Sequence, residues 1–444
     1  MANQSERCHT TAEPSANWLY TPEFPDDWER TPLYSLAQWV NGLPFREIQS
    51  KATGKPVIKI AEIKDGITGQ TKFTEQEFDD SVRVRSGDLL FSWSGQPETS
   101  IDAFWWRGPE GWLNQHVFRV TPKKQVDRTF FFYLLRYLKP NFVGIARNKQ
   151  TTGLGHVTKR DLENVQVALP PPAEQRGIAR ILGTLDDKFE LNRLMNETLE
   201  AVVSAIFRSW FVDFDPVRAK AEGRQPFGMD AEIVALFPDR LVDSELGEIP
   251  AGWEVTDVYR MSDVIYGAPF KSQMFNEVGQ GLPLIRIRDL RTQNPTVFTT
   301  ENHPKGYVVK PGDVVVGMDG EFRAYLWTGP EAWLNQRICC FKPHPGVSGA
   351  FVRYTIKEPL RVLEEAKTGT TVIHLGKSDI DAFRVVLPRP PILAAFGAIA
   401  ERFEAKILSD ATESRVLAAV RDALLPKLMS GEIRVTNVNH TAEH

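Results

Sequence analysis

The chain has 444 residues, with 53 Lys and Arg against 57 Asp and Glu, and a formal net charge of −4. That length exceeds one ordinary domain and suffices for two or three. Stand-alone nucleic-acid-binding proteins are usually basic, so the charge argues against that class while leaving room for local basic surfaces.

The cysteines and the apolar runs exclude further classes. Cys8, Cys339 and Cys340 give neither a disulfide framework nor a CxxC pair. The longest apolar runs reach about half of the ~20 residues that a membrane span requires. The polar N-terminal segment shows no signal-peptide core. We therefore expect a cytoplasmic protein with no membrane association and no metal site.

Taken in order, the chain alternates between mixed modules and long helices. The predicted segments are a disordered N-terminus over 1–20, a first module over 21–172, a helix over 173–212, a linker over 213–245, a second module over 246–390, a second helix over 391–434 and a tail over 435–444.

Within the first module the pattern predicts an α+β fold. Residues 57–63, 88–93 and 112–120 resemble strands, and residues 127–138 have the spacing of a helix. The stretch over 155–170 predicts a turn, a short helical start at Asp161 and a strand.

The second module repeats the first. Pro25, Trp28, Tyr34 and other residues of 24–45 recur 225 positions later, and the tetrapeptide WLNQ recurs from Trp112 to Trp333. His156 and the helix that follows recur 218 positions later. A solenoid repeat spans only ~20–50 residues, so this is a tandem duplication of whole modules.

Both helices carry an apolar heptad pattern, which indicates that they pack along each other. The predicted seam residues are Ile178, Leu182, Leu185, Phe189, Leu199, Val203, Ile206, Phe396, Phe403, Ile407, Leu417 and Leu424. Asn192, Asn196, Asp410 and Ser414 fall in the middle of the seam, where polar residues fix register. Asp186 and Asp187 lie outside the seam, and we interpret them as a solvated helix face.

The sequence offers no catalytic residues. It contains no GxxxxGK[ST] loop, no GxGxxG after a strand, no HExxH and no [DN]PP[YFW] tetrapeptide. Glu62-Ile63-Lys64 resembles only the end of a nuclease site.

Two loop regions are candidates for contact with a nucleic acid. His156 and His374 persist through the duplication, either as turn histidines that bond the backbone or as part of a loop that faces a nucleic acid. The neighbouring cations and hydroxyls suit phosphate contact. The aromatic and polar stretch after each Gly-Asp strand is the second region, although most of its tryptophans suit a core. The candidates are Trp93, Gln96, Arg107, Arg147, Lys149, Thr151, Thr152, His156 and Lys159 in the first module, and Arg323, Lys367, Thr370, Thr371, His374 and Lys377 in the second.

Four stretches of the chain resemble the specificity subunit of type I restriction–modification enzymes: residues 87–93, 169–217, 246–255 and 424–433. The resemblance implies two tandem pseudo-symmetric target-recognition domains separated by two long antiparallel coiled-coil helices. Each domain would read one half of a bipartite, asymmetric site in double-stranded DNA. The helices would dock two methyltransferase subunits, and nuclease-translocase subunits would join them. S-adenosylmethionine, ATP and Mg²⁺ would bind to those partners, and no cofactor would bind to this chain.

Two other interpretations remain open. A coiled-coil adaptor with two peptide- or protein-binding modules shares the helices but needs no DNA contact. An enzyme with an unrecognised site is the other, and the missing motifs disfavour it.

Overall fold

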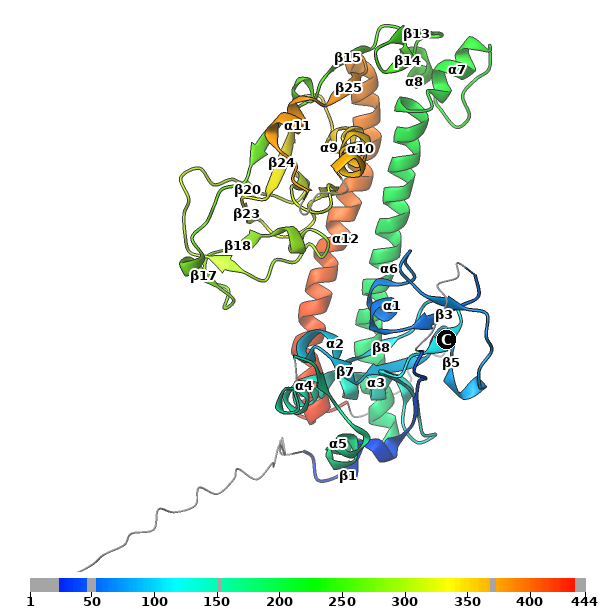
Figure 1. Ribbon diagram of the computed structural model, residues 1–444, viewed down its shortest axis with the longest axis vertical. Helices are drawn as coiled ribbons and strands as arrows, with labels where there is room; N and C mark the ends of the chain where they lie inside the picture. The colour runs from blue at the N-terminus through cyan, green and yellow to red at the C-terminus, as the bar shows by residue number, and fades with distance from the viewer. Residues whose placement is uncertain (1–23, 46–52, 151–152, 368–372, 436–444) are drawn as a thin grey trace, which may run out of the picture. The chain divides into compact units, whose positions relative to one another are not determined.

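The computed structural model describes residues 24–45, 53–150, 153–367 and 373–435. The chain forms two compact units, residues 1–187 with 418–444 and residues 188–417. Each unit contains one mixed module and a section of two long helices, α6 (Pro172–Phe211) and α12 (Pro390–Ser430), drawn in green and orange-red in Figure 1. The N-terminus expected to be disordered, 1–20, and nearly all of the predicted tail, 435–444, lie outside the described residues.

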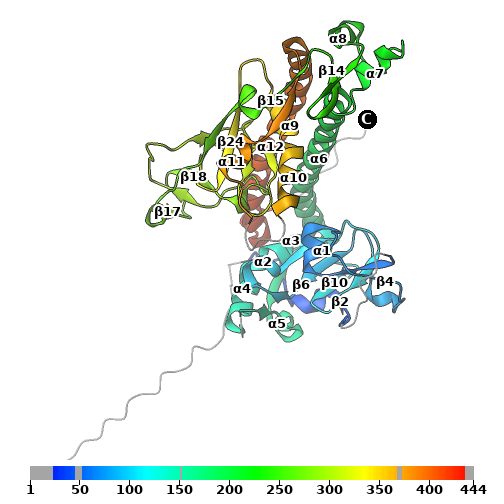
Figure 2. The ribbon, with the colours of Figure 1, turned by 45° about the horizontal axis from the view of Figure 1, so that its top comes forward.

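The main sheet of the first module is antiparallel, in the order β2-β10-β6-β8. Figure 2 labels β2, β10 and β6 of this sheet. Its strands are β2 (Ala37–Asn41), β10 (Val117–Pro122), β6 (Leu89–Ser92) and β8 (Asp102–Trp105). All four residues of β6 are buried, because the strand is central and covered on both faces. Helix α3 (Arg128–Tyr137) packs the run Phe130–Leu135 into the same core.

A second small sheet has the order β4-β3-β9-β5. It comprises β4 (Phe73–Thr74), β3 (Lys55–Ile58), β9 (Gly111–Leu113) and β5 (Arg83–Val84). Of the strand expected over 57–63, only Val57 and Ile58 are strand, because Lys59 caps the start of helix α1 (Ile60–Asp65). The strand expected over 112–120 is two strands in different sheets, since Asn114 accepts a hydrogen bond from the His116 amide and turns the chain.

The remaining elements of the first module connect these sheets. They are β1 (Glu29–Pro32), η1 (Leu33–Leu36), η2 (Asp80–Val82), β7 (Ser94–Gly95), α2 (Pro97–Ser100), α4 (Lys139–Asn148), β11 (Gly155–His156), α5 (Lys159–Asn164) and β12 (Gln166–Leu169). β1 pairs antiparallel with β12, so the first and last strands of the module lie side by side.

The second module repeats this plan. Its main sheet has the order β16-β24-β21-β22, with β16 (Ser262–Tyr266), β24 (Ile338–Pro343), β21 (Val314–Gly317) and β22 (Ala324–Leu326). Its smaller sheet comprises β17 (Phe275–Asn276), β19 (Phe298–Thr299), β18 (Leu282–Ile285), β23 (Ala332–Leu334) and β20 (Val308–Val309). The other elements are β15 (Glu254–Asp257), η3 (Val258–Arg260), η4 (Ser272–Met274), η5 (Ile287–Asp289), α9 (Gly349–Thr355), α10 (Lys357–Lys367), α11 (Lys377–Asp381) and β25 (Arg384–Leu387).

The segment expected to be a linker, 213–245, is folded. It contains α7 (Asp215–Ala221), α8 (Ala231–Leu236) and β13 (Leu241–Ser244), and β13 pairs with β14 (Gly247–Pro250). Phe214, Val217 and Phe237 are buried in the core of the second unit. These apolar side chains give the segment enough buried surface to fold, despite its Gly, Pro and charge.

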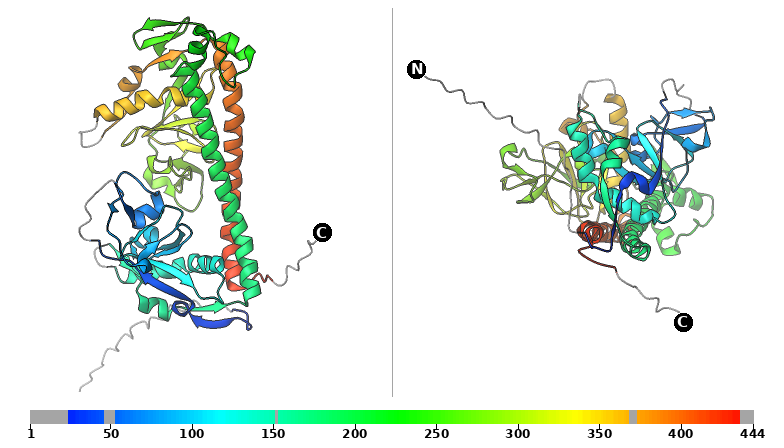
Figure 3. Two further views of the ribbon diagram at one scale, coloured as in Figure 1. Left: turned by 90° about the vertical axis from the view of Figure 1, so that its right-hand side faces the viewer. Right: turned by 90° about the horizontal axis from the view of Figure 1, so that it is seen from below.

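Helices α6 and α12 run antiparallel in each unit (Figure 3). In the second unit Asn192 donates a hydrogen bond to Glu413 at 2.9 Å, and Asn196 reaches the Ile407 carbonyl at 3.5 Å. Residue numbers therefore rise along one helix as they fall along the other. In the first unit Asp186 pairs with Arg421 at 2.8 Å. An α+β fold with two tandem modules and two long antiparallel helices is thus confirmed.

The seam between the helices differs in detail from the heptad prediction. Ile178, Leu182, Val203, Phe396 and Ile407 are buried. The predicted seam residues that are half-buried are Leu185, Leu199, Ile206, Phe403, Leu417 and Leu424.

Phe189 is the most exposed of the predicted seam residues, at 40%. Its neighbour Lys188 bonds Asn192 at 3.0 Å and Glu413 at 3.1 Å, so polar contacts begin at this level of the helix pair.

Candidate nucleic-acid interface

Three loop segments of the first module meet through main-chain hydrogen bonds. The Trp93 amide donates to the His116 carbonyl at 3.2 Å, and the Val157 amide donates to the Trp93 carbonyl at 2.8 Å. β7 and β11 pair so that His156 lies opposite Ser94. We call residues 93–96, 114–116 and 154–157 the first loop cluster.

The second module builds the same arrangement. The Met318 amide donates to the Arg337 carbonyl at 2.9 Å, and the Leu375 amide donates to the Met318 carbonyl at 2.7 Å. Asp319 and His374 form the equivalent bridge. We call residues 318–321, 335–337 and 373–375 the second loop cluster. The two clusters therefore share a backbone and differ in side chains.

Aromatic and amide groups dominate the first loop cluster. The Trp93 ring lies 5.7 Å from the His116 ring, and its Nε1 donates to Asn41 Oδ1 at 3.1 Å. The Gln115 amide lies 3.0 Å from the His116 ring nitrogen, and Gln96 is exposed. These groups can stack on bases and exchange hydrogen bonds with base edges.

Charged groups dominate the second loop cluster. Asp319 contacts His374 Nδ1 at 2.6 Å and Arg337 Nη1 at 3.3 Å. Next to them lies an open cavity of about 410 Å³, whose lining residues are Arg286, Ile287, Arg288, Asn335, Arg337 and Ile338.

Two of the predicted DNA-contacting lysines pair with acidic residues of their own module. Lys149 pairs with Asp161 at 2.6 Å, and Lys367 pairs with Asp379 at 2.6 Å. Both carboxylates cap short helices, α5 and α11. Burial opposes ionisation of Asp161, but hydrogen bonds from Lys149 and Thr158 outweigh it and hold the pKa of Asp161 below its ordinary value. The positive charge of both lysines is thus already balanced within the fold.

Other predicted cations also have acidic partners. Arg147 pairs with Glu98 at 2.5 Å, and Arg323 pairs with Glu321 at 3.1 Å. Their exposed side chains can exchange such partners for phosphate.

Lys159 and Lys377 hold equivalent positions at the starts of α5 and α11. Lys159 lies 3.6 Å from Glu163 and over the Tyr34 ring, and Lys377 lies 2.7 Å from Asp381. Arg107 is exposed after β8. Thr151, Thr152, Thr370 and Thr371 lie outside the described residues.

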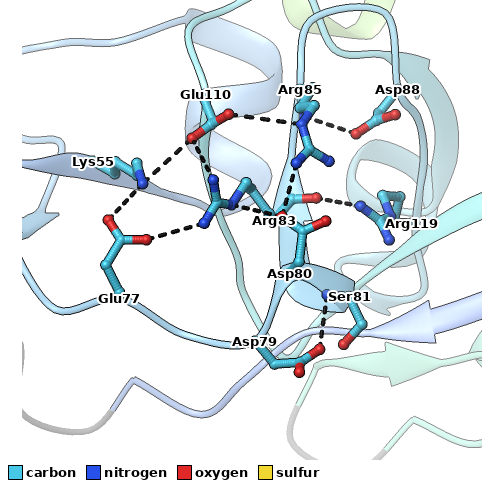
Figure 4. A network of polar contacts seen from close by, with 10 residues as sticks. All are labelled: Lys55, Glu77, Asp79, Asp80, Ser81, Arg83, Arg85, Asp88, Glu110 and Arg119. Carbon is cyan, nitrogen blue, oxygen red and sulfur yellow. Dashed lines mark hydrogen bonds and ion pairs between the residues drawn. The ribbon is translucent and has the colours of Figure 1, made fainter.

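A further group of charges lies on the smaller sheet of the first module (Figure 4). Lys55 and Arg83 lie over the buried Trp112 ring at 5.0 and 5.2 Å. Both also pair with Glu77, at 2.6 and 3.1 Å. The alternation of cations and carboxylates balances the charge locally, so this network stabilises the sheet rather than forming a basic patch.

The sequence prediction missed His116, Arg286, Arg288 and Arg337. The repeat carried a signal for two of them: His116 and Arg337 both follow WLNQ, so four identical residues precede a changed one. A backbone shared by the two modules that carries a different side chain in each is the pattern expected at a position that contacts bases.

The acidic residue of the nuclease-like tripeptide has a structural role. Glu62 is buried and accepts a hydrogen bond from the Lys59 amide at 3.1 Å, which caps α1. Asp289 does the same for Arg286 at 2.9 Å in the second module. This shared cap explains the acidic residue without any catalytic role.

Over the described residues, no group of three or more His, Cys, Asp or Glu side chains could hold a metal ion. Within the same ranges, no helix is both long and apolar enough to cross a bilayer.

Comparison with known proteins adds to this geometry. Residues 25–201 match the family model described as the type I restriction modification DNA specificity domain. The chain is 27% identical to the HindI specificity subunit of Haemophilus influenzae over 429 residues, covering 84% of this chain and 90% of that one. It is 24% identical to the MjaVIII specificity subunit of Methanocaldococcus jannaschii over 441 residues, covering 94% and 95%.

A solved structure shares the fold. The S subunit of a type I restriction–modification system from M. genitalium aligns with a TM-score of 0.50 at 13% identity, over 92% of this chain and 97% of that one.

Proposed function

We propose that this chain, which belongs to the type I restriction–modification specificity subunits, reads a bipartite, asymmetric site in double-stranded DNA. Each module contacts one half-site through its loop cluster. The chain carries out no catalysis itself and works in the cytoplasm as part of a larger complex.

The contrast between the two loop clusters carries this proposal. The main-chain hydrogen bonds at Trp93 recur at Met318, whereas the side chains Ser94 and His116 become Asp319 and Arg337. A shared backbone presents both sets in the same way, and different donors and acceptors select different base edges. Two loop clusters with the same backbone and different side chains suit a DNA site whose halves differ in sequence.

The helix pair supplies the fixed register that such a site requires. Asn192 is 2% exposed and hydrogen-bonds Glu413 and Ser414, at 2.9 and 3.3 Å. Asp410 is 1% exposed on the same seam. A buried polar contact opposes sliding of one helix along the other, because a shifted register would leave these groups unpaired. The gap between half-sites would then be constant.

The exposed face of α6 suits partner subunits. Leu191, Leu194, Met195 and Val202 are 55, 47, 41 and 38% exposed, so apolar side chains gather on a helix of the second unit. Such patches mark protein interfaces. We propose that two methyltransferase subunits dock on the helices, that nuclease-translocase subunits join them, and that S-adenosylmethionine, ATP and Mg²⁺ bind to those partners.

Exchange of one module tests the recognition role. Residues 246–390 are replaced by the same segment of a relative, the chain is co-expressed with its methyltransferase partner, and methylated adenines are mapped across the host genome. One half of the methylated motif should change and the other should persist. Methylation that is independent of the module would exclude this role and favour the adaptor with two protein-binding modules.

Lengthening both helices together tests the spacing. Seven residues are inserted between Asp187 and Lys188, and seven between Leu417 and Ala418, so that the internal contacts of each unit are kept. The insertion adds about 10 Å of helix, or roughly 3 base pairs. The tolerated gap should change while both half-sites persist, whereas altered half-sites with an unchanged gap would contradict a spacer role. Seven-residue insertion between Asp187 and Lys188 alone is the control. It should disrupt the complex, because α6 and α12 can then keep their register in only one of the two units.

A further inference from the structure

We propose that the arginine-lined cavity of the second module reads a guanine in the major groove, with Arg288 as the residue that contacts the base. This inference rests on the proposed function and assigns a base to one of its half-sites. The cavity is lined by three arginines and lies beside the second loop cluster.

Two of the three arginines are already held by carboxylates. The buried Asp289 accepts from Arg286 Nε at 3.2 Å, and it also caps the turn η5 through the Arg286 amide at 2.9 Å. Arg337 pairs with Asp319, which in turn contacts His374. These pairs fix the guanidinium groups around the cavity and balance much of their charge.

Arg288 differs from both. It is exposed at the middle of η5, and over the described ranges no carboxylate pairs with it. Its backbone is nevertheless fixed, because the Asp289 cap holds the turn on either side of it. A free guanidinium on a rigid turn matches the two acceptors, O6 and N7, of a guanine edge.

The cavity wall favours a base over a hydrated phosphate. Ile338 is fully buried, and Ile287 is half-buried and lines the same space. Apolar groups beside a guanidinium exclude water and strengthen its hydrogen bonds. An open cavity of about 410 Å³ also leaves space for the edge of a base pair.

The first module lacks this chemistry at the equivalent positions. The segment Arg286-Ile287-Arg288-Asp289 corresponds to Lys59-Ile60-Ala61-Glu62, and Arg337 corresponds to His116. The cap is kept, but Arg288 is replaced by Ala61. Half-sites that differ in sequence require different base contacts, and a cation found in only one module can supply such a contact.

The test compares two substitutions at Arg288 in the complex of full-length chain and methyltransferase partner. Arg288→Gln removes the charge, and Arg288→Lys keeps it while removing the bidentate geometry. Binding is measured against DNA duplexes in which each position of the second half-site is varied, at several salt concentrations. Circular dichroism and complex assembly establish that both variants fold.

Both variants should lose preference for guanine at one position of the second half-site, by about 10- to 100-fold. Preference in the first half-site should be unchanged. Arg361→Gln, on the exposed face of α10, is the matched control and should alter neither.

Three outcomes would overturn the inference. Uniform weakening on all sequences with Arg288→Gln, restored by Arg288→Lys and accompanied by a salt slope reduced by about one, would make Arg288 a phosphate contact. Unchanged discrimination would remove the cavity from the DNA interface. A lost preference for a base other than guanine would refute the assignment. In each case the module exchange still tests the proposed function separately.

Discussion

The hydroxyl of Tyr133 on α3 donates a hydrogen bond to Asp186 on α6 at 2.7 Å. Tyr354 holds the equivalent position on α9 and donates to Glu200 on α6 at 2.9 Å. Each module thus contacts a carboxylate of α6 through a tyrosine at the equivalent position. The neighbouring cation differs in origin, being Arg421 of α12 in the first unit and Arg353 of α9 in the second.

Removing the first tyrosine hydroxyl should loosen the first module on its helices. Tyr133→Phe should lower the free energy of unfolding of that unit by about 1 kcal/mol, because Asp186 loses a neutral donor but keeps Arg421. Burial, followed by the bond to Asp186, raises the pKa of Tyr133, so its hydroxyl remains a donor across the usable pH range. Urea unfolding followed by tryptophan fluorescence measures the change.

Tyr34→Phe is the control, since the described residues offer its hydroxyl no hydrogen bond. Equal changes in the free energy of unfolding for Tyr133→Phe and Tyr34→Phe would mean that the hydrogen bond to Asp186 contributes nothing to stability.

Removing the buried arginine of the second unit should lower the free energy of unfolding more than removing the Tyr133 hydroxyl does. The Arg353 side chain is 9% exposed and bridges Glu200 at 2.8 Å and Glu404 at 3.3 Å. Arg353→Met leaves two carboxylates without their partner and should destabilise the unit by about 3–5 kcal/mol. Thermal and urea unfolding measure this loss.

Arg361→Met is the matched control in the same module. Arg361 is 53% exposed and pairs with Glu358 and Glu365 on its own helix, at 2.5 Å each. Surface pairs of this kind contribute about 0–1 kcal/mol. A loss at Arg353 no larger than at Arg361 would contradict a structural role for the buried cluster.

Glu404 should make the stability of the second unit depend on pH. Burial raises its pKa to about 7 from 4.5, outweighing the attraction of Arg353, which lies closer to Glu200. Between these values the folded chain keeps a proton that the unfolded chain has lost, so stability falls as pH rises from 4.5 to 7. Glu404→Gln should remove this decline, by at most on the order of 3 kcal/mol.

The measurement compares unfolding of wild type and Glu404→Gln at pH 5, 6, 7 and 8. The difference in free energy should grow in favour of the variant up to about pH 7 and then level off. Glu277→Gln, at an exposed position of the same unit, should leave the profile of the wild type unchanged. Parallel profiles for wild type and Glu404→Gln would show that Glu404 titrates normally.

Replacing the polar centre of the seam should separate stability from spacing. Asn192→Leu should alter the unfolding free energy by no more than about 1 kcal/mol, because apolar burial compensates for the lost bonds to Glu413 and Ser414. The gap between methylated half-sites should become variable, which sequencing of methylated DNA would detect. Thr198→Leu, exposed on α6, should leave the gap fixed. A constant gap in Asn192→Leu would assign register to other contacts.

The repeat and the helices could be predicted because they leave periodic signals in one dimension. Element ends could not: α1 starts inside an apparent strand because Glu62 caps it, and that bond exists only when the turn forms. Asp186 illustrates the same limit. It was interpreted as part of a solvated face, but it bonds Tyr133, which lies 53 residues earlier in the chain.

The candidate site was predicted in part for similar reasons. The histidine loop and the stretch after the Gly-Asp strand do come together, as the pairing of His156 with Ser94 shows. The third segment, with His116 and Arg337, was missed because strand order is a tertiary property. Lys149 was predicted as a DNA contact because the sequence shows its charge. The sequence does not show that Asp161 balances this charge in the fold.

The frame of each loop cluster is made of main-chain bonds, such as those that join the amide and carbonyl of Trp93 to its neighbours. Amides and carbonyls are the same for nearly every residue, so point mutations at Ser94, His116, Asp319 or Arg337 leave the frame intact. The ancestry of the two modules shows that such drift has already happened once within this chain. A lineage can therefore acquire a new DNA target sequence by a few substitutions, without passing through a variant that fails to fold.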